Sequence, residues 1–192
     1  MNIIKSSLYC FCAFCLFVNT TLAATVNITP DAPEYHINDT VTLSIDGSDF
    51  TESVDGAGIT LSWDPSRLAY IGTTIDNPPW DTQSYIDTNA VNGTLDRIFV
   101  GSTSGAGTEF ALADITFTAF ALGATEVLIG TSGGGCVPGA CGIFSVNGEL
   151  LTSYAPAEVN IIPIPAAVWL FGSGVLGLLG FMRQRHPDNN NI

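Results

Sequence analysis

The feature of this sequence that most restricts its fold is an alternation of apolar and polar residues with a period of two. Val41, Leu43 and Ile45 alternate with threonine and serine, and Ile59, Leu61 and Trp63 do the same. Successive side chains of a β-strand point to opposite faces, so this pattern predicts strands with one buried face. Further segments of this kind are 98–100, 115–119, 127–129, 143–146 and 150–161.

Turn-forming residues separate these segments. The clusters include Asp46-Gly47-Ser48-Asp49, Asn77-Pro78-Pro79 and Asn147-Gly148, and the last, between apolar residues, predicts a β-hairpin. No apolar stripe of helical period appears outside the two termini. The pattern predicts an all-β antiparallel sandwich of roughly eight or nine strands.

The N-terminus, residues 1–23, has the organisation of a secretory signal peptide. Lys5 precedes an apolar stretch from Leu8 to Val18, and Thr21-Leu22-Ala23 forms a small-residue cleavage site. The alternative is an uncleaved anchor, but the apolar stretch is too short to span a bilayer. We expect the mature domain to occupy residues 24–160.

The C-terminal segment, residues 161–185, combines two prolines, an apolar run and two arginines. Pro163 and Pro165 interrupt any strand or helix that arrives from upstream. The uncharged run Ala166 to Met182 would span roughly 25 Å as a helix, the short end of what crosses a bilayer. Arg183 and Arg185 mark the cytoplasmic side. The run predicts one transmembrane helix followed by a short cytoplasmic tail, residues 186–192; the alternative is a buried core helix.

Charge is distributed very unevenly along the chain. Of its 18 acidic residues only Asp188 lies outside residues 24–160, and of its five basic residues only Arg67 and Arg97 lie inside that range. Such a surface repels nucleic acid and anionic lipid. It suits an exported protein. Such a surface can hold divalent cations weakly, but the favoured interpretation is a generic acidic secreted surface.

Two cysteines remain once the signal peptide is removed. Cys136 and Cys141 flank Val-Pro-Gly-Ala, and an exported pair is expected to form a disulfide. The Pro138-Gly139 turn between them predicts that the bridge pins a loop between two strands.

The sequence offers little catalytic chemistry. His36, the one histidine of the domain, lies in an early loop without a Gly-x-Ser-x-Gly motif, which favours a surface role over a Ser-His-Asp triad. Carboxylates are so numerous that pairs of them do not discriminate a glycosidase. We expect no enzymatic activity and no cofactor.

One group of acids is a weak candidate for calcium. Asp46, Asp49 and Asp55 crowd a short segment and offer oxygen ligands, but they lack EF-hand spacing, and a solvated turn is the alternative.

Two aromatic side chains are candidates for stacking on sugar rings. Trp80 follows Asn-Pro-Pro in a predicted loop and Tyr85 lies nearby, whereas the alternation places Trp63 in the core. The alternative for Trp80 is a loop residue that covers the edge of the sandwich.

The domain resembles the cohesin family and related carbohydrate-binding sandwich modules. The resemblance spans residues 26–159 and is carried by Val26-Asn27-Ile28-Thr29-Pro30, Asn38 to Leu43, Gly58 to Tyr70 with its Trp-Asp-Pro-Ser-x-Leu-x-Tyr string, and Ala113 to Ala119. It implies a jelly-roll sandwich of cohesin type that binds rather than catalyses. Its implied partners are a polysaccharide or a dockerin-like protein.

The C-terminal segment resembles a known sorting tail. Ile162-Pro163-Ile164-Pro165-Ala166 followed by Trp169 to Gly174, an apolar run and arginines is similar to the VPLPA variant of the PEP-CTERM signal, with isoleucine in place of valine and leucine. This resemblance implies a Gram-negative bacterium whose exosortase cuts near the proline motif.

Together these patterns predict an exported, non-catalytic binding module. We expect it to be held in the inner membrane by its C-terminal helix and then to reach the cell surface or medium after processing. The favoured hypothesis is carbohydrate binding in the extracellular matrix; the alternative is a cohesin-type module that captures a dockerin-like partner.

Overall fold

The computed structural model describes residues 23–87, 89–131 and 141–184. Most of the predicted signal peptide, Cys136, Arg185 and the predicted tail 186–192 lie outside the described residues. The first strands are β1 (Ala24–Pro30), β2 (Thr40–Ser48), β3 (Gly56–Ser62), β4 (Leu68–Ile75), β5 (Thr82–Ile86) and β6 (Thr94–Gly101), with a 3-10 turn at Ala90–Asn92. They are followed by β7 (Phe110–Ala119), β8 (Gly123–Gly130), β9 (Gly142–Ser145), β10 (Gly148–Leu150), β11 (Thr152–Ala155), β12 (Ala157–Ile161) and helix α1 (Ala166–Gln184).

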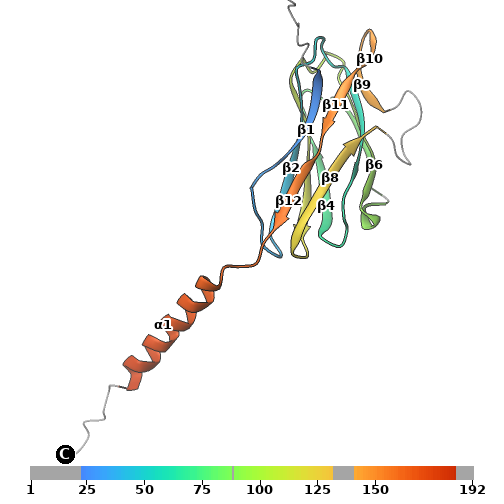
Figure 1. Cartoon of the computed structure of the whole chain (residues 1–192). Helices are drawn as coiled ribbons and strands as arrows, with labels where there is room; N and C mark the ends of the chain where they lie inside the picture. The colour runs from blue at the N-terminus through green and yellow to red at the C-terminus, as the bar shows by residue number, and fades with distance from the viewer. Residues whose placement is uncertain (1–22, 88, 132–140, 185–192) are drawn as a thin grey trace, which may run out of the picture.

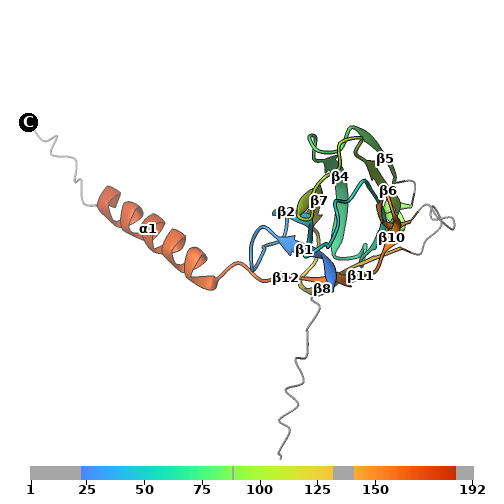
Figure 2. The same ribbon diagram turned by 90° about the horizontal axis from the view of Figure 1, so that it is seen from above.

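The strands form two sheets that face each other across a common core (Figures 1 and 2). The first sheet has the order β11-β1-β2-β7-β4. The second has the order β10-β9-β3-β6-β5, and β8 and β12 extend it from β3. The predicted all-β sandwich is therefore confirmed.

Strand β3 has partners along both edges. On one side it pairs with β6. On the other side its first half, Gly56–Gly58, pairs with β9 and its second half, Thr60–Ser62, pairs with β8. This arrangement makes β3 the centre of the second sheet.

One long apolar segment, predicted as a single strand, is divided between the two sheets. Pro156 separates β11, which joins the first sheet, from β12, which joins the second. Proline has no N–H to donate to a ladder, so the strand is interrupted where the chain passes from one sheet to the other. Strand β11 lies parallel to β1, an exception to the predicted antiparallel pairing.

The core contains two groups of aromatic rings. Trp63 packs edge-on against Phe117 with ring centroids 5.0 Å apart, and its indole N–H donates to the Leu68 carbonyl at 3.0 Å. Trp80 packs edge-on against Phe110 at 5.3 Å, and its N–H donates to the Ala111 carbonyl at 2.8 Å. Both tryptophans thus bury a large apolar ring while satisfying its polar atom.

Two details of the strand prediction need correction. The turn between β9 and β10 uses Val146 and Asn147, because Gly148 already pairs with Ser145; the predicted hairpin is present but shifted by one residue. Strand β5 was not predicted, because its first four residues are exposed and show no alternation.

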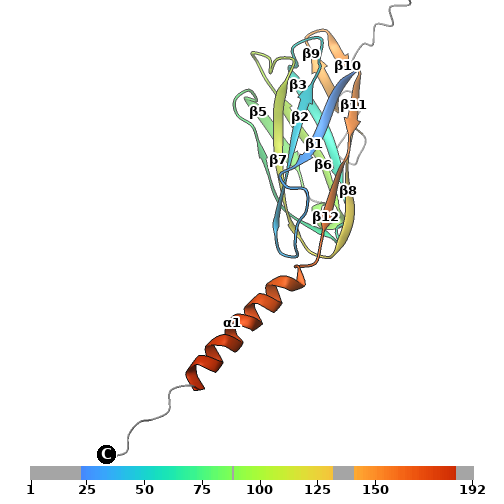
Figure 3. The same cartoon turned by 60° about the vertical axis from the view of Figure 1, so that its left-hand side comes forward.

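Helix α1 extends away from the sandwich (Figure 3). Side chains from Leu170 to Leu179 are exposed, including Phe171 and Leu176, so this part of the helix is not the buried core helix considered as an alternative. Among the described residues no helix is long and apolar enough to cross a membrane. The transmembrane part of the fold prediction is unconfirmed.

The sandwich has a complete core without the helix. All buried core residues lie between Val26 and Ile161. The end of β12 is also hydrogen-bonded within the domain, since the Ile162 N–H donates to the Tyr35 carbonyl at 2.7 Å. A fragment of residues 24–165 therefore contains everything the sandwich packs against.

Gly47 tests how tightly this core is packed. A Cβ at Gly47 would overlap the Phe110 ring, which is itself confined by Phe50 and Trp80. We expect Gly47→Ala to lower the free energy of unfolding by about 1–3 kcal/mol, as overpacking does. Gly72→Ala is the matched control, because its Cβ would meet nothing within 4 Å. Urea denaturation measures both; equal stability of the two variants would contradict this packing.

Candidate binding face

The outer face of the first sheet is polar and acidic. Because Val41, Leu43 and Ile45 point into the core, Thr42, Ser44 and Asp46 of β2 point outward. Asp114 and Thr116 of β7 lie beside them, and the Ser44 hydroxyl donates to Asp114 at 2.7 Å. The first sheet also has an exposed apolar residue, Ile71, which lies at a bulge of the edge strand β4.

One acidic group on this face, Asp46, has a raised proton affinity. Partial burial raises the pKa of the Asp46 carboxyl, and the negative charges of Asp114 and Asp76 raise it further. A surface of hydroxyls and mutually repelling carboxylates keeps its water, which makes it a poor place for a protein partner to dock.

The outer face of the second sheet has a different composition. Along β3 the residues Ala57, Ile59 and Leu61 are buried in the core. The outward positions are therefore Gly56, Gly58, Thr60 and Ser62. All are small; Gly56 and Ser62 at the two ends are partly exposed, whereas Gly58 and Thr60 between them are buried.

Larger apolar side chains flank this row of small residues. Phe144 of β9 lies opposite Gly56, Phe99 of β6 lies opposite Gly58, and Leu128 of β8 lies opposite Ser62. Directly opposite residues share a face of the sheet. The Leu128 side chain is 46% exposed, and both phenylalanines are partly exposed.

A bulge in β6 adds a charge to the same face. Leu95 and Ile98 are buried, so the two residues between them, Asp96 and Arg97, lie on the outer side where the register with β3 shifts. Ile86 of β5 lies opposite Arg97. We call this surface the β3 face; it consists of Gly56, Gly58, Thr60, Ser62, Arg97, Phe99, Leu128 and Phe144.

Trp80 does not lie on any surface, and the prediction that it is exposed is wrong. Its side chain is 0% exposed and fills the core beside Phe110. The Asn-Pro-Pro sequence before it turns the chain inward rather than outward. Tyr85 is 46% exposed, but it stands alone at the edge strand β5, opposite the core residue Ile98.

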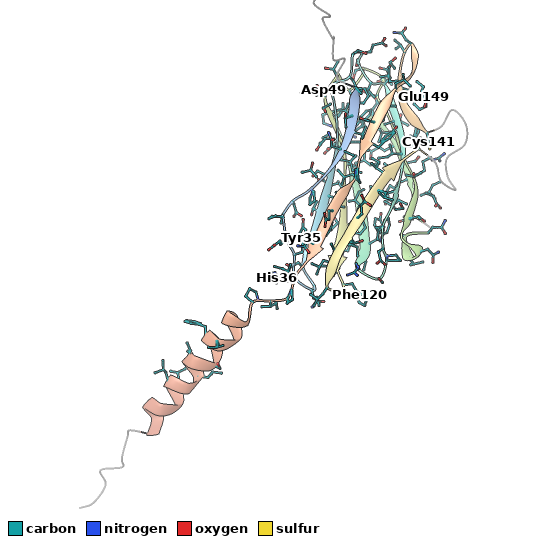
Figure 4. All side chains as sticks on the ribbon, viewed as in Figure 1. Tyr35, His36, Asp49, Phe120, Cys141 and Glu149 are labelled. Carbon is teal, nitrogen blue, oxygen red and sulfur yellow. The ribbon has the colours of Figure 1, made fainter. Side chains whose placement is uncertain are left out.

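The predicted calcium residues do not form a site. Asp46 lies within β2 of the first sheet, whereas Asp55 directly precedes β3 of the second. Figure 4 places Asp49 at the end of the sandwich far from α1. Within residues 23–87, 89–131 and 141–184, no three His, Cys, Asp or Glu side chains come together as metal ligands would. The chain crosses from one sheet to the other within this segment, which separates its carboxylates.

The remaining predicted residues are placed as follows. His36 lies in a loop at the α1 end of the sandwich and contacts Asp39 at 3.4 Å (Figure 4). Cys141 is disulfide-bonded. Its predicted partner Cys136 lies outside the described residues, so that pairing stays a prediction. Pro163, Ile164 and Pro165 are exposed and have no regular structure, and Ala166 begins α1.

The β3 face was missed by the sequence-based prediction, although part of its pattern is visible. The string Gly56-Ala-Gly58-Ile-Thr60-Leu-Ser62 alternates small with apolar residues. This pattern indicates a strand whose outward side chains are unusually small. Phe99, Leu128 and Arg97 could not be assigned to this face without knowing which strands lie next to β3.

Comparison with known proteins relates the fold to cohesins. No family model and no curated protein sequence matches this chain. A type II cohesin domain from the cellulosome of Acetivibrio cellulolyticus superposes with a TM-score of 0.59 at 18% identity, covering 72% of this chain and 95% of that one. The sixth cohesin of scaffoldin B from the same organism, solved in complex with a Cel5 dockerin, gives 0.59 at 16%, covering 73% and 99%.

A third similar structure comes from outside cellulosomes. The non-cellulosomal cohesin of the archaeon Archaeoglobus fulgidus gives a TM-score of 0.57 at 9% identity, covering 73% of this chain and 91% of that one. At such identities the likeness establishes the fold. The domain is a cohesin-like β-sandwich.

The burial of Trp80 predicts that its removal unfolds the domain. We expect Trp80→Ala to lower the free energy of unfolding by about 3–5 kcal/mol, because it leaves a cavity and an unpaired Ala111 carbonyl. Tyr85→Ala, at an exposed edge, should change it by less than about 1 kcal/mol. Chemical denaturation followed by circular dichroism distinguishes them; wild-type stability in the Trp80 variant would contradict the assignment.

Proposed function

We propose that this domain is a non-catalytic protein-binding module whose β3 face captures a dockerin-like partner. Cohesins of similar fold are solved in complex with dockerins from Acetivibrio cellulolyticus and Clostridium thermocellum. The fold similarity supports a partner of this class for the present chain, and the β3 face supplies a surface suited to it.

The observation that carries this proposal is the contrast between the two outer faces. On the first sheet, Thr42, Asp46 and Asp114 present hydroxyl and carboxylate groups that are costly to desolvate. On the second sheet, Phe99, Leu128 and Phe144 expose apolar atoms beside small residues. Apolar area removed from water contributes roughly 25 cal/mol per Å². A partner therefore gains more by docking on the second sheet than on the first.

Protein binding accounts for the structure better than sugar binding does. The carbohydrate hypothesis depended on two exposed aromatic rings, Trp80 and Tyr85, and the first is buried. The β3 face offers partly exposed apolar side chains beside a charged one, a combination that protein interfaces use.

Site-specific photo-crosslinking tests the proposed face. A photoreactive phenylalanine analogue at Leu128 should crosslink one exported partner protein in the producing cells. The same analogue at Ile71, an apolar residue of similar exposure on the other sheet, is the control. Mass spectrometry identifies the products. Equal crosslinking from the two positions, or none from Leu128, would contradict the proposed function.

We also propose that the protein is exported and sorted through its C-terminal segment. It would be held in the inner membrane by that segment and then released or re-attached at the surface by an exosortase-type enzyme. The exposed residues 163–165 between β12 and α1 support this, because a processing protease needs an exposed substrate.

Processing is tested by the C-terminus of the mature protein. In a host with the sorting enzyme we expect mass spectrometry to find a protein that lacks Ala166 onward. In a host without it, the full chain should fractionate with the inner membrane. An intact C-terminus through Ile192 in both hosts would show that the segment is not a processing signal.

A further inference from the structure

We propose that Arg97 is the specificity anchor of the β3 face and that it binds an aspartate or glutamate carboxylate of the partner. This inference rests on the proposed function, since it names the chemistry by which that face selects its protein. It goes further in assigning a charge to the partner at one defined position.

The register places Arg97 inside the face rather than at its rim. Arg97 lies opposite Ile86 of β5 and beside the bulge at Thr60 of β3, where the strands follow the order β8-β3-β6-β5. Thr60 is 7% exposed and Ile86 is partly covered, so the guanidinium lies on a largely desolvated floor. Ion pairs formed in such surroundings are less screened than those at an open rim.

The guanidinium of Arg97 has no partner within the described part of the chain. Its Nε is buried without a hydrogen-bond acceptor, and no ion pair joins it to any carboxylate described in residues 23–87, 89–131 and 141–184. The neighbouring Asp96 instead accepts a hydrogen bond from Asn89 at 2.5 Å. A buried donor without an acceptor costs free energy. Arg97 as a whole is partly exposed, so an incoming carboxylate would meet the part of its guanidinium beyond the buried Nε.

Arg67, the other basic residue of the domain, does contact an acid, so the composition of the domain does not prevent an arginine from finding a partner. Arg67 lies 3.4 Å from Asp64 and donates to the Leu122 carbonyl. In a domain with so many acids, an arginine that pairs with none of the described ones is available for an external group. A guanidinium binds a carboxylate through two parallel hydrogen bonds, which gives direction as well as affinity.

Acidic residues elsewhere on the same face restrict how the partner lies. Glu126 of β8 and Glu158 of β12 stand directly opposite each other, and both point outward because Val127 and Val159 are buried. Like charges repel a second carboxylate there. The partner's acid is therefore steered towards Arg97 on β6 and away from the β8–β12 edge, which sets one orientation on the face.

The experiment measures affinity for the protein identified by crosslinking at Leu128. Isothermal titration of the 24–165 domain with that purified protein should show at least tenfold weaker binding for Arg97→Gln and a larger loss for Arg97→Glu. Arg97→Lys keeps the charge but loses the two parallel hydrogen bonds of the guanidinium, so its affinity should fall between those of wild type and Arg97→Gln. Arg67→Gln is the matched control: it removes the same charge elsewhere and should change affinity less than twofold.

A charge swap completes the test. Replacing the partner's contacting acid by arginine should restore binding to Arg97→Glu, and the double-mutant cycle measures the coupling directly. Thermal melts confirm that each variant is folded. If the crosslinked partner binds Arg97→Gln as tightly as wild type, the proposed function stands and the anchor is wrong. If no protein crosslinks at Leu128 in preference to Ile71, both are wrong.

Discussion

The pairing of β3 along both of its edges is the constraint on which the rest of the structure depends. Its inward residues Ala57, Ile59 and Leu61 line the core, and the three ladders along its two edges fix where β6, β8 and β9 lie. A shift of register by one residue would turn the apolar side outward and the glycines inward. The same alternation that buries the core therefore determines the composition of the outer face.

This coupling explains how much could be predicted from the sequence. Period-two alternation identifies a sandwich and most of its strands, because burial of one face is a local property of each strand. The core position of Trp63 follows from the same pattern and is confirmed. Strand β5 and the division at Pro156 are set by tertiary packing and by the passage of the chain between sheets, which no local pattern encodes.

The predicted site residues show even more clearly that local sequence patterns do not encode tertiary placement. Trp80 follows two prolines and was a candidate for exposed sugar stacking, with a loop residue covering the edge of the sandwich as the alternative. Its indole instead reaches the Ala111 carbonyl in the core. Asp46 and Asp55 are near in sequence, but Asp46 lies in β2 of the first sheet and Asp55 directly precedes β3 of the second. The β3 face is formed by strands from four separate parts of the chain, so its side chains could be grouped only once the strand order was known.

The central claim is that a protein partner docks on the second sheet, and NMR chemical-shift mapping tests it most directly. In the 15N-labelled domain titrated with the crosslinked partner, the account predicts perturbed amides along β3, β6 and β8, centred on Thr60 and Arg97. Amides of β2 and β7 should remain unchanged. Perturbations confined to β2 and β7, or to the loops at either end of the sandwich, would contradict it.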